Sequence, residues 1–159
     1  MANIGYSLNQ AARVRGRSTF TDRRGGLGGI SSGYNGYFKV SDASEIYDDG
    51  TRILKVRVED GSGFSRFVCG YATINNTRFS VDAADITIEK SCGIYLESKI
   101  SDDGSFEFRP RVIASESPSY SENFSYFLIA RVFVNDEDML EIVQEHHGEI
   151  QAIIWGSCD

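Results

Sequence analysis

From residue 37 onward, hydrophobic and polar side chains alternate along the chain with a period of two. The clearest case is residues 54–58, where Leu54, Val56 and Val58 alternate with charged side chains. Successive side chains of a β-strand point to opposite faces, so this alternation predicts strands with one buried face. No segment after residue 37 keeps a helical period. The pattern therefore predicts an all-β body.

Clusters of Asp, Asn and Gly divide this body into short strands joined by tight turns. The predicted strands are residues 37–40, 54–58, 67–74, 77–81, 86–88, 94–100, 106–112, 126–134, 139–145 and 150–155. Turns are predicted at residues 48–50, 102–104 and 135–138, and residues 60–63 are expected to end the second strand. Asparagine tolerates positive φ, so residues 75–76 are predicted to form a two-residue hairpin loop.

Residues 126–134 are apolar on both faces except at Arg131. This pattern predicts a central strand covered on both sides, or a strand at a subunit contact. For residues 136–146 an amphipathic helix competes with a strand, and the β-branched pair Ile142 and Val143 favours the strand. Many short strands at this spacing predict an antiparallel β-sandwich or a jelly-roll-like barrel.

Charge and glycine content divide the sequence at residue 33. Residues 1–33 contain five arginines against one acid, Asp22, whereas residues 34–159 contain 11 Lys/Arg and 22 Asp/Glu. The basic part is dense in glycine and has few large apolar side chains, so it cannot bury enough surface to offset its chain entropy. We therefore predict an extended Gly/Arg-rich anchoring arm over residues 1–33 and a β-sandwich domain over residues 34–159.

The predicted anchoring residues are the arginines of the arm: Arg13, Arg15, Arg17, Arg23 and Arg24. Guanidinium groups suit carboxylates, so the arm is predicted to dock on an acidic protein or on a sister subunit. The alternative is a solubilising tail. Five charges on an acidic protein would bind a duplex weakly, so nucleic acid is not an expected partner. Residues 2–14 have roughly helical spacing, and such a short helix is marginal without a partner.

The sequence also bounds the cellular setting. No run approaches 18 apolar residues, so no membrane partner is expected, and the N-terminus lacks the apolar stretch of a secretory signal. The three cysteines, Cys69, Cys92 and Cys158, are an odd number without a C-x-x-C pair. They predict reduced thiols in a protein made in the cytosol, with the first two as small core residues.

Catalytic chemistry has little support, and we expect neither an enzyme nor a cofactor. The metal-like cluster is His146 and His147 with Glu145 and Glu149. Adjacent strand residues point to opposite faces, so two neighbouring imidazoles would not share an ion, and no metal site is expected. The predicted subunit-contact residues are Arg131, His146, His147 and Trp155.

Three alternatives stay open at this stage. The acidic turns could supply oxygens to calcium, although none matches an EF-hand loop. A sugar-stacking platform would make the chain a glycan-binding β-sandwich module, and its candidate rings are Tyr34, Tyr37, Tyr47, Tyr71, Tyr95, Tyr120, Tyr126 and Trp155. The many acids permit a pair of facing carboxylates, as in glycoside hydrolases, without indicating one.

Several segments read in order resemble those of a known group. They are residues 36–40 (GYFKV), 60–61 (DG), 70–75 (GYATIN), 126–132 (YFLIARV) and 142–150 (IVQEHHGEI). Over residues 36–156 the chain resembles small β-rich minor structural proteins of tailed bacteriophages and prophages, especially those of gut bacteria. The resemblance implies a non-enzymatic virion component made in the bacterial cytoplasm, such as a head decoration, collar or tail appendage. It implies other virion proteins and further copies of the chain as partners.

Overall fold

The computed structural model describes residues 18–22, 36–69, 72–99, 109–119 and 124–156. Within these ranges the chain forms strands and turns and no helix. The strands are β1 (Ser18–Asp22), β2 (Val40–Asp42), β3 (Glu45–Ile46), β4 (Arg52–Ile53), β5 (Lys55–Val58), β6 (Gly61–Cys69), β7 (Ala72–Val81), β8 (Ala84–Thr87), β9 (Cys92–Lys99), β10 (Arg111–Ser115), β11 (Phe124–Val134), β12 (Leu140–Gln144) and β13 (Ile150–Gly156). The all-β prediction is confirmed.

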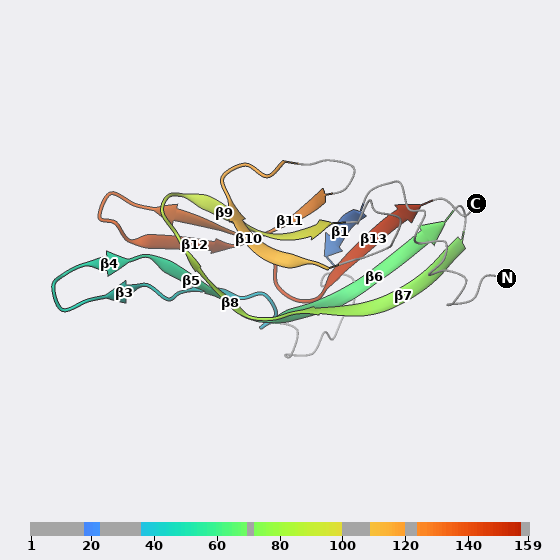
Figure 1. The fold of residues 1–159 in the computed structure, drawn as a ribbon, viewed down its shortest axis with the longest axis horizontal. Helices are drawn as coiled ribbons and strands as arrows, with labels where there is room; N and C mark the ends of the chain where they lie inside the picture. The colour runs from blue at the N-terminus through green and yellow to red at the C-terminus, as the bar shows by residue number, and fades with distance from the viewer. Residues whose placement is uncertain (1–17, 23–35, 70–71, 100–108, 120–123, 157–159) are drawn as a thin grey trace.

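One layer is built on a long antiparallel ribbon that runs most of the length of the body (Figure 1). β5 pairs with β8, and the same two stretches of chain continue as the pair β6 and β7. β2 extends the ribbon beside β5, while β13 extends it beside β6. β13 runs parallel to β6 and antiparallel to β1, which gives the sheet order β1-β13-β6-β7.

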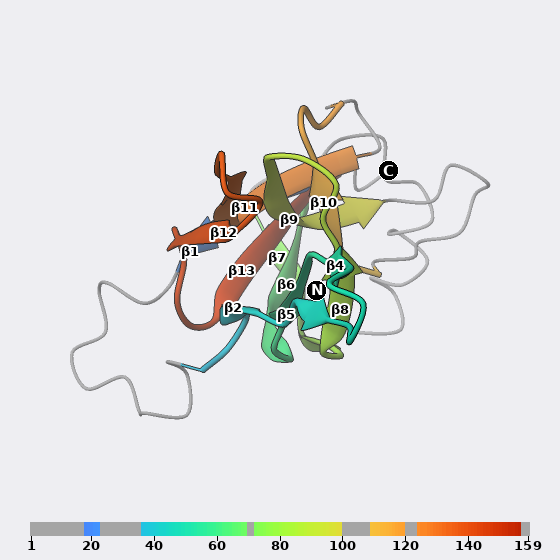
Figure 2. The ribbon, with the colours of Figure 1, turned by 90° about the vertical axis from the view of Figure 1, so that its left-hand side faces the viewer.

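The second layer is the antiparallel sheet β10-β9-β11-β12. Seen from the end that carries β3 and β4, this layer lies above β2, β5 and β8 (Figure 2). β11 is central in this sheet, as predicted, but Arg131 and Phe133 are exposed, so it is not covered on both sides along its whole length. Its register against β9 shifts at Ile129. The prediction of a strand rather than a helix near Ile142 is confirmed by β12.

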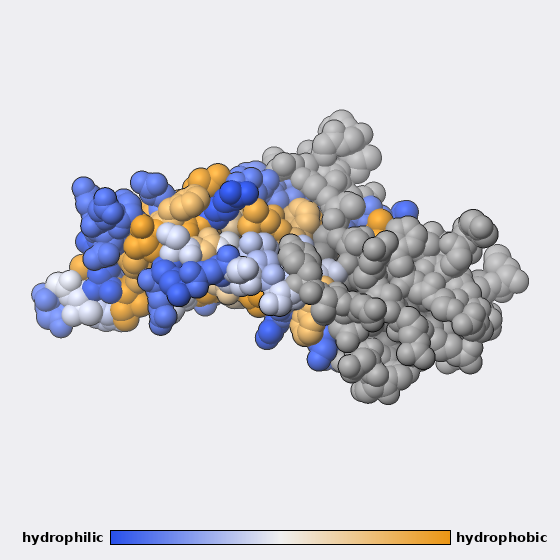
Figure 3. Space-filling view, turned by 90° about the horizontal axis from the view of Figure 1, so that it is seen from above, coloured by the Kyte–Doolittle hydropathy of each residue, from blue (hydrophilic) through white to orange (hydrophobic). Residues whose placement is uncertain are grey.

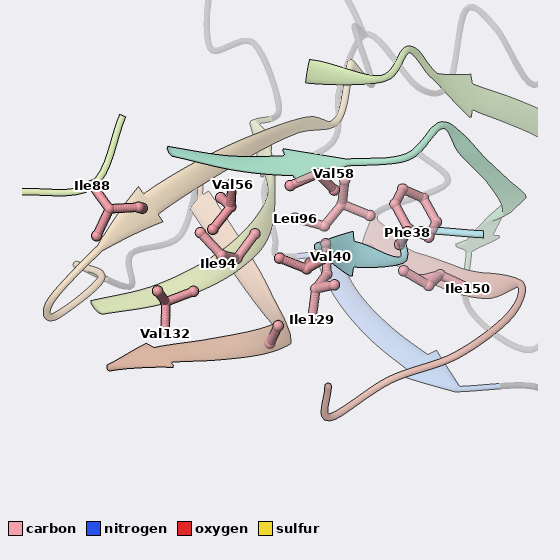
Figure 4. Packing of buried hydrophobic residues seen from close by; sticks show 11 residues of the cluster. Phe38, Val40, Val56, Val58, Ile88, Ile94, Leu96, Ile129, Val132 and Ile150 are labelled. Carbon is pink, nitrogen blue, oxygen red and sulfur yellow. The ribbon is translucent and has the colours of Figure 1, made fainter. Parts of the chain in front are cut away.

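The core lies between the two layers and contains aliphatic side chains from most strands of both layers (Figure 4). Val56 and Val58 on β5 face Ile94 and Leu96 on β9, and all four are fully buried. Each such side chain contributes about 1.5–3 kcal/mol when it leaves water. The period-two alternation thus identified the buried face of these strands.

Phe38 fixes the chain at the start of the body. It lies in a turn closed by the Lys39 amide and the Gly36 carbonyl oxygen, 3.3 Å apart, and its φ is 58°. A bulky residue rarely adopts this conformation, at a cost of about 1–3 kcal/mol. Complete burial of the ring against Gly61 offsets that cost, because a Cβ at Gly61 would lie only 2.4 Å from the ring. The predicted strand at residues 37–40 therefore begins later, at Val40.

Two sequence predictions need correction. β5 ends at Val58, just before the predicted strand end at residues 60–63, but Gly61 already begins β6, where the absence of a side chain leaves room for the Phe38 ring. Asn75 and Asn76 do not form a hairpin loop, since both lie within β7 and pair with Phe67 and Arg66. The chain reverses between Cys69 and Ala72, where Gly70 is the stronger turn residue.

The predicted arm requires a correction at residues 18–22. This segment forms β1 and pairs with β13 in five residue pairs, from Ser18 with Ile154 to Asp22 with Ile150. Its sequence, STFTD, is rich in β-branched and aromatic residues, and β13 offers the sheet edge that it covers. The rest of the segment 1–33 lies outside the described residues, as do the predicted turn at 102–104 and the predicted helix at 2–14.

Candidate functional site

Two hairpins lie side by side at one end of the body (Figure 1). We call this region the hairpin end and define it as residues 42–54 and 133–143. The first hairpin joins β3 to β4 through the predicted turn at residues 48–50. The Thr51 amide donates to Asp49 Oδ1 at 2.8 Å, and Gly50 adopts a φ of 88° that favours glycine. The Asp-Asp-Gly sequence thus determines this reversal locally.

The second hairpin joins β11 to β12 through the predicted turn at residues 135–138. Asn135 Oδ1 accepts hydrogen bonds from the amides of Glu137 (2.9 Å) and Met139 (3.1 Å). Asp138 adopts a φ of 56°, a left-handed conformation that Asp tolerates better than most residues. The carboxylates of this turn therefore stay at the surface while the Asn side chain closes the loop.

Arg52 joins the two hairpins. Its guanidinium donates to the Asp138 carbonyl oxygen at 3.1 Å and to the Glu137 carbonyl oxygen at 3.5 Å. These contacts link residues that are about 85 positions apart in sequence. Since the acceptors are backbone oxygens, the Arg52 contacts leave the carboxylates of this turn at the surface.

A cleft of about 340 Å³ lies between the hairpins. We call it the hairpin cleft; its lining residues are Asp42, Ser44, Ile46, Arg52, Leu54, Asp138, Met139 and Leu140. Half of the lining is aliphatic or thioether, and two of these side chains are open to water: Ile46 is 69% exposed and Met139 is 50% exposed. The cleft therefore combines apolar walls with two carboxylates, a hydroxyl and a guanidinium group.

Exposed large hydrophobic residues concentrate at the hairpin end. Among the described residues, those that are exposed are Ile46, Tyr47, Phe133, Met139 and Val143, and all five belong to this region. Figure 3 shows hydrophobic side chains in bands between hydrophilic ones toward this end. Ile46 and Met139 meet in the hairpin cleft, and exposed apolar surface with a polar rim is typical of an interaction site.

The hairpin end is also strongly acidic. Its sequence contains eight Asp or Glu residues and one basic residue, Arg52. A hydrogen bond from the Tyr47 hydroxyl, followed by contacts with Lys55, lowers the pKa of Glu45. Hydrogen bonds from Thr51 lower the pKa of Asp49. Both carboxyls therefore remain ionised at lower pH than ordinary ones.

The structure separates the predicted subunit-contact residues. Arg131 is on the outer face of β11, with its Nε 3.3 Å from Glu145 Oε1, and His147 is exposed. His146 is 1% exposed, so its predicted contact role is wrong. Its ring packs edge-on against Phe127 at 4.8 Å, and Nε2 lies 2.8 Å from the Gly148 carbonyl oxygen. For Trp155 the structure describes only the backbone, in β13.

The five arginines predicted to anchor the arm all lie outside the described residues. Cys92 is half-buried beside the core, and burial raises the pKa of its thiol. In the described ranges no group of three or more His, Cys, Asp and Glu residues is arranged to hold a metal ion. The described part of the chain also contains no helix long and apolar enough to cross a membrane.

Described tyrosines do not form a flat exposed platform. Tyr47 is exposed, whereas Tyr37, Tyr95 and Tyr126 are half-buried. The rings of Tyr95 and Tyr126 meet at 82° with centroids 6.2 Å apart, so the two rings do not present one plane to a sugar. Glycan binding stays a prediction, without a stacking surface in this part of the structure.

Comparison with protein-family models, with curated proteins and with solved structures finds no match to this chain. Its role must therefore be argued from its own geometry. The hairpin cleft is the site that sequence reasoning missed. The available signal was the placement of Ile46 and Tyr47 directly before an Asp-Asp-Gly turn, and of Met139 directly after Asp136-Glu137-Asp138.

Proposed function

We propose that this chain is a non-enzymatic structural protein of a tailed-phage virion, joined to its neighbours at the hairpin end and through its basic N-terminal segment. The observation that carries the proposal is the gathering of exposed hydrophobic side chains at that end, with Ile46 at 69% and Met139 at 50% exposure. Surface of this kind is costly to leave in water and is stabilised by a partner.

The pairing of β1 supports attachment through the N-terminal segment. β1 is hydrogen-bonded to β13 along its length, so residues 1–17 start from a fixed point at the edge of a sheet. These residues contain Arg13, Arg15 and Arg17 and no acid. A basic segment anchored to an otherwise acidic body is suited to binding acidic protein surfaces.

The resemblance of residues 36–156 to minor structural proteins of tailed phages supports the virion setting. Virion components are held together by many repeated protein contacts, and this role requires contact surfaces rather than catalytic sites. Exposed apolar residues at one end of an elongated body fit such a role. A free-standing enzyme would instead require a pocket with converging catalytic groups.

The test is incorporation into particles. Epitope-tagged full-length chain and a variant lacking residues 2–17 are produced during phage growth, and purified particles are analysed by mass spectrometry and immunogold labelling. This deletion stops before Ser18 because β1 belongs to the body. We expect the full chain in the particles and loss of the shortened one. Absence of the full chain from particles would refute the proposal, and specific hits on a glycan array would then favour the glycan-binding alternative.

A further inference from the structure

We propose that residues 1–17 of one copy dock into the hairpin cleft of a neighbouring copy, so that subunits associate head to tail. This inference rests on the proposed structural function and identifies the partner of the hairpin end. The occupant is a named segment of this chain, and the acceptor is the surface between the two hairpins. Three observations carry it: chemical complementarity, position and reach.

The segment and the cleft are complementary in composition. Residues 1–17 combine three arginines with apolar side chains such as Ile4 and Leu8, and they lack acids. The hairpin cleft combines exposed Ile46 and Met139 with a region of eight acids and one base. Apolar side chains of the segment can cover the exposed walls while guanidinium groups pair with surrounding carboxylates.

The two surfaces lie at opposite ends of the body. Ser18 pairs with Ile154, and Ile154 pairs with Phe67, near the ends of β13 and β6. In Figure 1 these strand ends lie at the far end from β3 and β4. The chain enters β1 at Ser18, so the preceding residues join the body on the side away from the cleft. Donor and acceptor are therefore different patches, which is the arrangement of a heterologous contact that forms rings or filaments.

Residues 1–17 are long enough to make this contact while β1 stays paired with β13. Seventeen extended residues span at most about 60 Å. β1 can keep its pairing with β13 while the preceding residues cross to the next copy. The arrangement needs no exchange of strands between bodies. Each copy therefore remains a complete β body before and after assembly.

Two variants separate the donor from the acceptor. Arg13→Glu/Arg15→Glu/Arg17→Glu damages the segment, and Ile46→Lys/Met139→Lys damages the cleft. Both altered cleft side chains are exposed, so the body should fold, and circular dichroism with urea midpoints checks this. Ala114→Lys is the matched cleft control, since Ala114 is exposed on β10 and lies outside the hairpin end. Lys39→Glu/Lys90→Glu/Lys99→Glu is the control for the segment, because these exposed lysines belong to the body and their reversal changes the net charge by the same amount.

Sedimentation velocity of the full chain over a concentration series measures association. We expect wild type and both controls to form species larger than a dimer, and each damaged variant to associate at least about tenfold more weakly. Salt at about 1 M, where the Debye length is about 3 Å, should also weaken wild-type association. The decisive sample is a one-to-one mixture of the two damaged variants. It retains one intact segment and one intact cleft per pair, so it should form a dimer that cannot grow.

A wild-type chain that is monomeric at every concentration would overturn the inference, as would a mixture that stays monomeric. Unchanged association of either damaged variant would do the same. These outcomes are distinguishable from failure of the virion role, because the sedimentation experiment contains no other phage protein. Head-to-tail association of a chain absent from particles would refute only the virion role, and incorporation of a chain without such association would refute only the docking.

Discussion

Gln144 is the residue whose replacement tests most directly how the two layers are joined. Its side chain lies between β2 and β12 and is half-buried. Oε1 accepts a hydrogen bond from the Val40 amide at 2.8 Å. Nε2 donates to the carbonyl oxygens of Phe38 at 3.0 Å and His146 at 2.9 Å, with a longer contact of 3.5 Å to Ile129. One amide thus satisfies backbone groups from three parts of the chain.

Gln144→Leu keeps much of the volume and removes these bonds. The three groups within 3.0 Å each lose a partner, and an unsatisfied buried backbone group costs about 1–3 kcal/mol. Because Gln144 is only half-buried, water can compensate in part. We therefore expect a loss of about 3 kcal/mol, a large share of the 5–15 kcal/mol typical of a domain.

Urea unfolding followed by circular dichroism measures this loss. With a slope of about 2 kcal/mol per molar, the midpoint should fall by about 1.5 M while the slope stays unchanged. Glu141→Leu is the matched control, since Glu141 is exposed on the same strand and should change stability by less than about 0.5 kcal/mol. A loss below about 1 kcal/mol for Gln144→Leu, or equal losses for both variants, would show that Gln144 does not join the layers.

Three further predictions follow from the turn at Phe38 and from the first hairpin. Gly61→Ala places a methyl group 2.4 Å from the Phe38 ring and should lower the free energy of unfolding, measured in urea, by about 1–3 kcal/mol. Gly36→Ala meets nothing within 4 Å and should be nearly neutral. Equal effects of the two variants would refute the packing argument. Phe38→Gly should be more stable than Phe38→Ala by about 1 kcal/mol, because glycine adopts a φ of 58° without strain, and the opposite order would contradict the strain. Tyr47→Phe should raise the pKa of Glu45 toward its ordinary value in an NMR titration, since the Tyr47 hydroxyl is the largest cause of its lowering. A carboxyl whose pKa is lower in the folded state stabilises the fold above its unfolded pKa, and this contribution is lost as pH falls through the folded pKa. Tyr47→Phe should therefore narrow the pH range between the folded and unfolded pKa values of Glu45. An unchanged pKa of Glu45 would refute the assignment.

Local patterns predicted the strands well where one face is buried and the turn chemistry is strong. The alternation around Val56 and the Asp-Asp-Gly turn at residue 50 both appear in the structure as expected. Prediction failed where a distant residue decided the outcome. Gly61 has the composition of a turn residue, but it begins a strand because the Phe38 ring occupies the space beside it. Asn75 lies in β7 because the chain reverses earlier, between Cys69 and Ala72.

The candidate site was likewise visible in the sequence only where it depends on neighbouring residues, and not where it depends on distant ones. Its acidic turns and the exposed pair Ile46 and Tyr47 could be seen in the sequence, but their meeting with Met139 could not. The contact depends on Arg52 reaching backbone oxygens of the second hairpin, about 85 residues away. His146 illustrates the reverse error, since a polar residue near a strand end was expected at the surface and is buried against Phe127.

By itself, the sequence determined the all-β class, the separation of a basic segment from an acidic body, and the turns that carry their own capping side chains. These properties depend on composition and on neighbours within a few residues. Only the tertiary structure decided that β1 covers the edge of β13, that Gln144 joins two layers and that the two hairpins form one cleft. Such contacts join residues far apart in the chain, and their free energy exists only after the sheets have closed around a common core.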